Sequence, residues 1–235
     1  GLVVFAGVAI SQVKIGFGVP GAARRSFGNF DIDPDGDLFG PGREVGDGWE
    51  WRGPVKPSQQ VWIRNTNGPV EVVQGTGDML EVITEKSWRN SEPSSVELVP
   101  VTSERGVTIC ALWAARERRC GPGGEYEQRH VRKNDVAVRF TVRLPRGVKI
   151  DVQTVNGELA IEGAAAPVVA NTVNGSIEAS MDALTGGDIE LGTVNGGVTA
   201  VLPERLNAVL EASTVNGRVE TDFPFQVTGK ITPRH

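Results

Sequence analysis

The sequence has few of the side chains on which most enzyme chemistry depends. Only two histidines occur in 235 residues, His130 and His235, and there is no Gly-x-Ser-x-Gly, Walker or Rossmann glycine motif. A glycosidase needs two carboxylates at a cleft, whereas Glu158, Glu162 and Glu178 fall on outward positions of predicted strands. We therefore expect a protein that is not an enzyme, with no catalytic residues.

Nucleic-acid binding and membrane spanning also lack their usual signatures. The formal net charge is −5 with no basic stripe, and no run approaches the roughly 18 apolar residues of a membrane span. No segment has a convincing helical period. The chain instead holds 30 Gly, 14 Pro and abundant Val, which predicts an all-β protein with many turns.

Cysteine is scarce, and its two copies lie close together. Cys110 and Cys120 enclose an Arg- and Gly-rich stretch, without a Cys-x-x-Cys motif or clustered histidines. This spacing favours a disulfide over a zinc site, with two unrelated thiols as the alternative. A disulfide would indicate an extracellular or cell-surface protein.

The most regular feature is the tetrapeptide Thr-Val-Asn-Gly, which occurs at residues 154–157, 172–175, 193–196 and 214–217. Residues 65–68 are a degenerate copy with the same apolar offsets on both sides. The spacings of 18, 21 and 21 residues are typical of a stacked repeat architecture. The predicted repeat corners are Asn67, Asn156, Asn174, Asn195 and Asn216.

Each repeat has alternate apolar residues on both sides of Asn-Gly, so each flank is predicted to be a short strand with one buried face. Asn-Gly readily holds positive φ and would form a tight corner. The units could be β-hairpins with two-residue turns, or the rungs of a β-solenoid in which like residues stack. We favour the solenoid, because stacking rewards identity and asparagine amides can hydrogen-bond along a ladder.

The domain order follows from composition. Residues 59–235 form the β-strand-repeat domain, a β-meander over 59–144 followed by the repeats of 145–235. The predicted meander strands are 60–64, 70–73, 80–86, 95–101, 107–112 and 136–144, and the basic span up to Lys133 is predicted to be an exposed excursion. Its excess of basic residues could alternatively meet an acidic cell-wall polymer.

Residues 1–19 form an apolar N-terminal segment. One interpretation is the remnant of a signal peptide or a segment next to a membrane anchor. The other is a β-strand buried on both faces, inserted into its own core or donated to a neighbouring copy. The predicted assembly strand comprises Val4, Val8, Ile10, Val13, Ile15 and Phe17.

Residues 20–58 are rich in Gly, Pro and Asp and are predicted to be mostly loop. Asp31, Asp33, Asp35 and Asp37 alternate along a segment with a glycine at position 36, as at the start of a calcium loop, although the EF-hand glutamate is absent. Calcium is therefore the one candidate cofactor, against a solvated acidic turn. Trp49 and Trp51 would share one face of an extended segment, as a sugar platform or as a core contact.

Residues 144–150, the Thr-Val-Asn-Gly repeats and the segment Thr221-Asp222-Phe223-Pro224 together resemble the putative adhesin family of β-strand-repeat proteins, a domain of unknown function. The resemblance covers about residues 58–235. It implies a bacterial or archaeal, often envelope-associated β-solenoid without known enzymatic activity. The family pattern commonly continues into one more Asn-Gly rung, and it does not explain the apolar segment 1–19.

Three functional hypotheses follow. The first is an adhesin-like structural protein that assembles with itself, because a repeat stack without its last rung would expose a template for a strand such as 1–19, and head-to-tail contacts propagate into filaments. The second is a monomeric, membrane-tethered module that binds carbohydrate or cell wall through Trp49, Trp51 and the basic span. A polysaccharide-acting enzyme is the third and least favoured.

Overall fold

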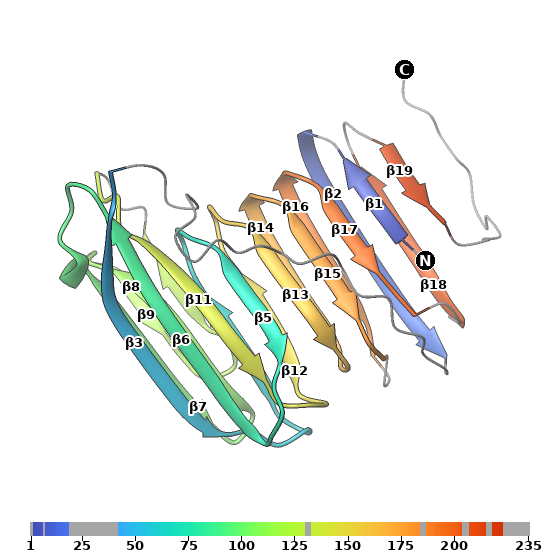
Figure 1. The fold of residues 1–235 in the computed structure, drawn as a ribbon, viewed down its shortest axis with the longest axis horizontal. Coiled ribbons are helices and arrows are strands. Elements are labelled where there is room, and N and C mark those ends of the chain that lie inside the picture. Colours follow the sequence, from blue (N-terminus) through green and yellow to red (C-terminus); the bar gives the residue numbers. More distant parts are fainter. Residues whose placement is uncertain are drawn as a thin grey trace.

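The computed structural model describes residues 2–6, 8–18, 42–129, 133–183, 187–203, 207–214 and 218–222. Within these ranges the chain folds into two large mixed β-sheets and one two-stranded sheet (Figure 1). Among the described residues the single helical element is a 3-10 turn, η1 (Pro93–Ser95), and no described helix is long and apolar enough to cross a membrane. The prediction of an all-β chain is confirmed.

Sheet A has nine strands in the order β19-β1-β17-β15-β13-β5-β11-β6-β3. Their bounds are β19 Arg218–Thr221, β1 Leu2–Ala6, β17 Val198–Val201, β15 Ile177–Met181, β13 Leu159–Ala164, β5 Val70–Gln74, β11 Ala137–Leu144, β6 Met79–Trp88 and β3 Glu44–Pro54.

Sheet B has eight strands in the order β18-β2-β16-β14-β12-β4-β8-β7. Their bounds are β18 Asn207–Thr214, β2 Val8–Gly18, β16 Ile189–Asn195, β14 Val168–Asn174, β12 Lys149–Gln153, β4 Gln60–Arg64, β8 Gly106–Trp113 and β7 Val96–Ser103. The small third sheet pairs β9 (Arg118–Cys120) with β10 (Tyr126–Gln128).

Each repeat unit places one strand in each large sheet. The chain runs along sheet B, turns at Asn-Gly and continues in sheet A, as in β4–β5, β12–β13, β14–β15 and β16–β17. We call such a strand pair a rung. Successive rungs pair in parallel and in register, for example Ile150↔Val168↔Ile189 in sheet B and Leu159↔Ile177↔Val198 in sheet A. The hairpin alternative is wrong, since the two strands of a unit lie in different sheets.

The core lies between sheets A and B and is aliphatic. Inward residues such as Ile63, Ile150, Leu159 and Phe140 are at most 1 % exposed. Alternation along each strand places every second residue in this layer. Burial of these side chains supplies the main driving force for folding, as expected for two sheets packed face to face.

The corner tetrapeptide is explained by contacts between rungs. The threonines are buried, and their hydroxyls donate to the glycine carbonyl of the preceding rung: Thr154 to Gly68 at 3.3 Å, Thr172 to Gly157 at 3.0 Å and Thr193 to Gly175 at 2.8 Å. The valines Val155, Val173 and Val194 face solvent, each 37–38 % exposed.

Positive φ at the corner falls on the glycine and not on the asparagine: Gly68, Gly175 and Gly196 have φ of +118°, +156° and +159°. Among the described residues, only Asp47 and Lys133 are non-glycine residues with positive φ. The glycine is also required for stacking. A Cβ on Gly157 would lie 2.0 Å from the carbonyl oxygen of Gly68, and a Cβ on Gly175 would lie 2.1 Å from that of Gly157.

Two further expectations need correction. Residues 59–144 are not a simple β-meander, because β4 and β5 separate into different sheets and pair in parallel with strands distant in sequence. Their strand positions nevertheless agree with the prediction to within about two residues at each end. The region 20–58, predicted to be mostly loop, contains the long strand β3 at the edge of sheet A.

Candidate functional site

The N-terminal segment occupies a full rung within the repeat stack. Strand β2 lies between β16 and β18 in sheet B, and β1 lies between β17 and β19 in sheet A (Figure 1). All four pairings are antiparallel, whereas the neighbouring repeats pair in parallel. A segment from the start of the chain thus separates two repeats that are adjacent in sequence. We call this position the strand slot.

The register in sheet B matches residue types on both sides of the slot. Ile15 pairs with Ile189 and Leu210, Lys14 with Glu190 and Glu211, and Ser11 with Thr193 and Thr214. Apolar residues therefore share register with apolar residues, a hydroxyl with two hydroxyls, and a lysine with two glutamates. Paired cross-strand residues lie on the same face of a sheet. The order of apolar, charged and hydroxyl residues along this segment is therefore that of a repeat strand with the chain direction reversed.

The same holds in sheet A. Phe5 pairs with Val198 and Val219, and Val3 pairs with Ala200 and Thr221. Val198 and Ala200 are completely buried, so Phe5 and Val3 take the register positions of core residues. Val4 pairs with Thr199 and Glu220 and takes the register of the opposite face.

The slot preserves the alignment of the repeats on either side. Ile189 and Leu210 both pair with Ile15, and Thr193 and Thr214 both pair with Ser11. These are the same residue pairs that the repeat period would align if β18 stacked directly on β16. Over residues 11–15, the inserted strand therefore leaves the alignment of the two flanking repeats unchanged.

The predicted assembly residues fall on this segment with mixed outcomes. Val13, Ile15 and Phe17 pair with Ala212, Leu210 and Ala208 in β18, positions that alternate as expected. Val8 pairs with Asn195 beyond a register shift, and Ile10 lies within that irregular part. Val3, Phe5, Ser11 and Lys14 were missed, because their significance depends on the partner register. The segment forms two strands in two sheets rather than one strand.

The corner asparagines form the predicted ladder. Asn174 donates from Nδ2 to Oδ1 of Asn156 at 2.7 Å, and Asn195 donates to Oδ1 of Asn174 at 2.8 Å. Asn67 instead donates to the carbonyl of Val136 at 3.0 Å, although its backbone bridges to Asn156.

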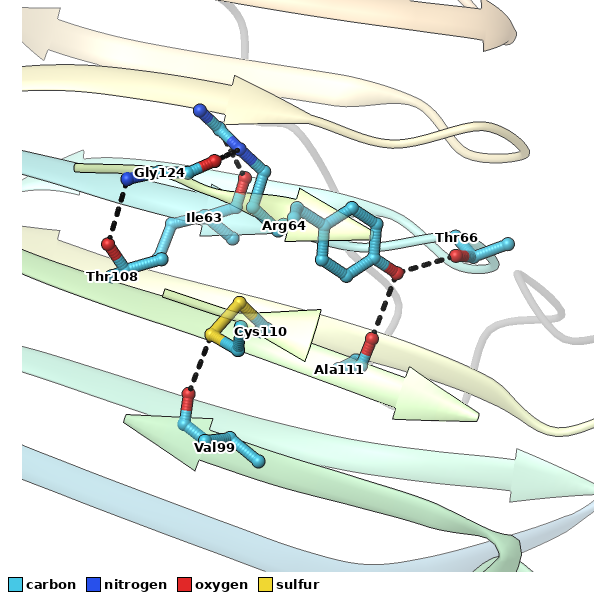
Figure 2. The surroundings of a disulfide bond; sticks show 10 residues. Ile63, Arg64, Thr66, Val99, Thr108, Cys110, Ala111 and Gly124 are labelled. Carbon is cyan, nitrogen blue, oxygen red and sulfur yellow. Dashed lines mark hydrogen bonds between the residues drawn. A yellow bond between two sulfur atoms is a disulfide. The ribbon is translucent and has the colours of Figure 1, made fainter. Parts of the chain in front are cut away.

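A disulfide joins Cys110 on β8 to Cys120 on β9, as predicted, and attaches the β9–β10 hairpin to sheet B (Figure 2). Gly124 donates its backbone N–H to the Thr108 hydroxyl at 3.0 Å. The Tyr126 hydroxyl donates to the carbonyl of Ala111 at 3.0 Å. It also forms a hydrogen bond of 2.7 Å with the side-chain hydroxyl of Thr66. Burial raises the pKa of Tyr126 to about 12, against the lowering effect of the bond with Thr66.

Under this hairpin lies an ion pair between a buried arginine and a partly buried aspartate, which sequence reasoning missed. Arg64 is 3 % exposed and donates to both carboxylate oxygens of Asp151 at 2.9 Å, and also to the carbonyl of Gly124 at 3.0 Å. Such a bidentate pair is a strong, oriented contact. Arg64 occupies an outward position of a predicted strand, where a side chain is ordinarily exposed to solvent. Its burial could therefore not be recognised from the sequence.

The residues proposed for a glycan ligand are largely engaged elsewhere. Trp49 and Trp51 are half-buried and pack against the core, which supports the core-contact interpretation. In the basic span, Arg118 pairs with Glu97, Arg119 with Glu125 and Arg129 with Glu117. These paired side chains remain largely exposed, so the described part of the span is the predicted exposed excursion, although its basic residues are charge-paired.

The outward face of sheet A carries carboxylates. Burial raises the pKa of Glu71, as does nearby Glu162, and Arg139 and Arg143 oppose this shift. Burial and Glu158 likewise raise the pKa of Glu178. In the part of the chain that the structure describes, no group of three or more His, Cys, Asp or Glu is placed to hold a metal ion.

Several predicted positions lie outside the described residues. These are the candidate calcium ligands Asp31, Asp33, Asp35 and Asp37, the fifth corner Asn216, both histidines, and residues 223–235.

No protein-family model matches the chain, and no curated protein matches it. Among solved structures, the chain is similar to a putative cell adhesion protein from Clostridium sporogenes ATCC 15579, with 11% sequence identity and a TM-score of 0.34. The match covers 57% of this chain and 61% of that chain. The chain thus has distant structural similarity to a protein described as adhesive.

Proposed function

We propose that this chain is a non-enzymatic structural or adhesin-like protein of the cell envelope or extracellular space, and that copies assemble by exchanging the N-terminal strand pair. In this proposal the repeats form a short β-solenoid, and β1–β2 of one copy fill the strand slot of the next. The partner is a second copy of the same chain. Strand addition of this kind gains affinity from main-chain hydrogen bonds and specificity from alternate side-chain positions.

The observation that carries the proposal is the register match on both sides of the strand slot. The segment is separated by about 180 residues from the rungs that it contacts, so its own copy has no local connection that requires it there. The slot admits a strand pair without disturbing the repeat register. A pair from a neighbouring copy would meet the same partners, and a head-to-tail contact that does not close would propagate into a filament.

The disulfide supports the extracellular location. Disulfides persist in oxidising compartments, and Cys110 and Cys120 are joined in the structure. The described part of the chain also holds no free cysteine, which fits the same environment.

Cysteine cross-linking between separate copies tests the exchange. Lys14 and Glu190 are direct cross-strand partners, and paired Cα atoms in antiparallel strands lie within disulfide range. Chains with Lys14→Cys are mixed with chains with Glu190→Cys under mild oxidation. We expect covalent dimers, and none when Gln153→Cys, an exposed position elsewhere in sheet B, replaces Glu190→Cys.

Charge reversal provides an independent test. Lys14→Glu places a third carboxylate in register with Glu190 and Glu211, and like charges opposite one another destabilise strand pairing. We expect assemblies seen by size-exclusion chromatography or electron microscopy to shrink. Lys149→Glu, an exposed position of sheet B outside the slot, should leave them unchanged. A protein that stays monomeric at all concentrations with residues 1–19 present, and gives no mixed cross-link, would refute the proposal.

A further inference from the structure

The corners of the repeat are chemically reactive sequences. In Asn-Gly the backbone nitrogen of glycine can attack Cγ of the asparagine, since the absence of a Cβ leaves the approach open. The new N–Cγ bond forms a five-membered imide while the side-chain amide leaves as ammonia, which carries away the glycine N–H proton. Water then opens the ring to aspartate or isoaspartate. The sum is asparagine plus water giving the acid plus ammonia, with no oxidation or reduction.

Stacked rungs restrain this reaction at three corners. The attacking backbone N–H groups are engaged as donors: Gly68 to Asn156 at 2.7 Å, Gly157 to Asn174 at 2.9 Å, and Gly175 to Asn195 at 3.0 Å. The oxygens Oδ1 of Asn156 and Asn174 also accept from the next asparagine in the ladder. Attack requires that the glycine N–H leave its acceptor and that the asparagine side chain turn toward its own backbone. The backbone hydrogen bonds between rungs and the asparagine side-chain ladder must therefore both open locally.

The corner Asn195–Gly196 differs from these. Among the residues that the structure describes, no hydrogen bond engages the backbone N–H of Gly196, and none reaches Oδ1 of Asn195. The neighbouring strand here is β2, which runs antiparallel and shifts register between Thr193 and Asn195. Asn195 is exposed to solvent, as are Asn156 and Asn174, so the hydrogen bonds and not the exposure distinguish the corners. The described ladder therefore ends at this corner.

We propose that Asn195–Gly196 is a self-modification site, at which the chain deamidates spontaneously while Asn156 and Asn174 are protected. Conversion removes the Nδ2 donor to Asn174 and places a carboxylate beside the Oδ1 atom that had accepted the bond. Isoaspartate additionally lengthens the backbone between β16 and β17. The modification loosens the repeat next to the strand slot, and it does so whether the strand pair there comes from the same copy or from another.

The four Thr-Val-Asn-Gly corners provide their own controls, because the reacting local sequence is the same. The folded full-length chain is held in mildly alkaline buffer, and deamidation at each corner is followed by mass spectrometry with fragmentation that separates aspartate from isoaspartate. We expect Asn195 to react about tenfold or more faster than Asn156 and Asn174, the effect of one hydrogen bond of typical net strength. In urea the corners should react at similar rates.

Two outcomes would overturn the assignment. One is equal protection of Asn156, Asn174 and Asn195 in the folded chain. The other is a preference for Asn195 that persists unchanged in urea, which would attribute the rate to local sequence. Asn195→Gln keeps a side-chain amide, lacks the five-membered route and should abolish the modification at this corner, without affecting the rate at Asn156, whose Oδ1 accepts from Asn174.

Discussion

A corner glycine could be required for one of two reasons: a left-handed backbone, or the close approach of neighbouring rungs. Replacing Gly157 by alanine separates these reasons. The backbone of Gly157 does not lie in the left-handed region, yet a Cβ there would be 2.0 Å from the carbonyl oxygen of Gly68 and 2.5 Å from its carbon. Both clashing atoms are backbone and cannot rotate away. If stacking is the reason, Gly157→Ala must force two rungs apart.

The cost can be worked from the structure. A normal Cβ···O contact requires the rungs to separate by about 1 Å, which exceeds the tolerance of a hydrogen bond. The bonds affected are Gly68 N–H to Asn156 at 2.7 Å, Asn156 N–H to Thr66 at 2.9 Å and Val70 N–H to Glu158 at 3.0 Å. At about 1 kcal/mol net for each bond, Gly157→Ala should cost about 3 kcal/mol of unfolding free energy.

Two matched glycines calibrate this value. Gly147 has φ of +77° and only Pro57 nearby at 3.7 Å, so Gly147→Ala tests backbone strain alone and should cost about 1 kcal/mol. Gly77 has neither constraint, and Gly77→Ala should be neutral or slightly stabilising. Urea unfolding gives all three values, and a melting scan should place Gly157→Ala about 6–12 °C below the parent. A loss at Gly157 no larger than at Gly147 would refute the stacking argument.

Three further predictions concern other parts of the chain. Cys110→Ala with Cys120→Ala opens a link that spans 10 residues and should cost about 2.5 kcal/mol in urea unfolding; an unchanged midpoint would show that the hydrogen bonds of the hairpin suffice. The Asp135 carboxylate is somewhat desolvated, but hydrogen bonds from Ser91 and from the backbone amides of Asn90, Ser91 and Arg89 prevail and lower its pKa from 3.8 to about 2. The folded state therefore binds this proton more weakly, so Asp135 adds stability above the unfolded pKa of about 3.9 that is lost as the pH falls toward about 2. Asp135→Asn should flatten the melting temperature between about pH 5 and pH 2, and a curve as steep as the parent's would contradict this. Calcium, but not magnesium, should raise the melting temperature if Asp31, Asp33, Asp35 and Asp37 bind it, and the rise should vanish on replacing all four by asparagine; no rise in the parent would rule out calcium at this loop.

The repeats were predictable because each local rule agrees with the fold. Alternating apolar residues around Asn-Gly define the inward face of each strand, and identical residues at a fixed period imply stacking, so Ile150, Val168 and Ile189 could be placed on one ladder from sequence. The structural role of the corner glycine could not be predicted from the sequence. A turn and a close approach between rungs both select glycine, and only the distance from Gly157 to Gly68 distinguishes them.

The candidate site depended on pairing across long sequence distances, which local pattern does not encode. The alternation in residues 8–18 predicts a strand, but an alternating strand fits either direction and several partners. Because the segment runs antiparallel to both neighbours, Lys14 is in register with two glutamates and Ser11 with two threonines. Arg64 was missed for a related reason, since its partner Asp151 and its cover, the β9–β10 hairpin, are both remote in sequence.

The two ends of the sheets differ in a way that gives the proposed assembly a direction. At the end opposite the strand slot, the edge strand β7 carries Pro100, which offers no N–H, and the edge strand β3 has a register shift between Gly46 and Trp49 around Asp47. Proline and bulges on edge strands are devices that prevent further strand pairing. Strand exchange is therefore disfavoured at β3 and β7, whereas within the repeats Ile15 and Lys14 find matched partners on both sides. A copy could then donate its strand pair and accept one at the repeats while its other end stays closed. Pro100→Val adds a backbone N–H to the β7 edge. This substitution should create a second, slot-independent mode of association, which Lys14→Glu does not suppress.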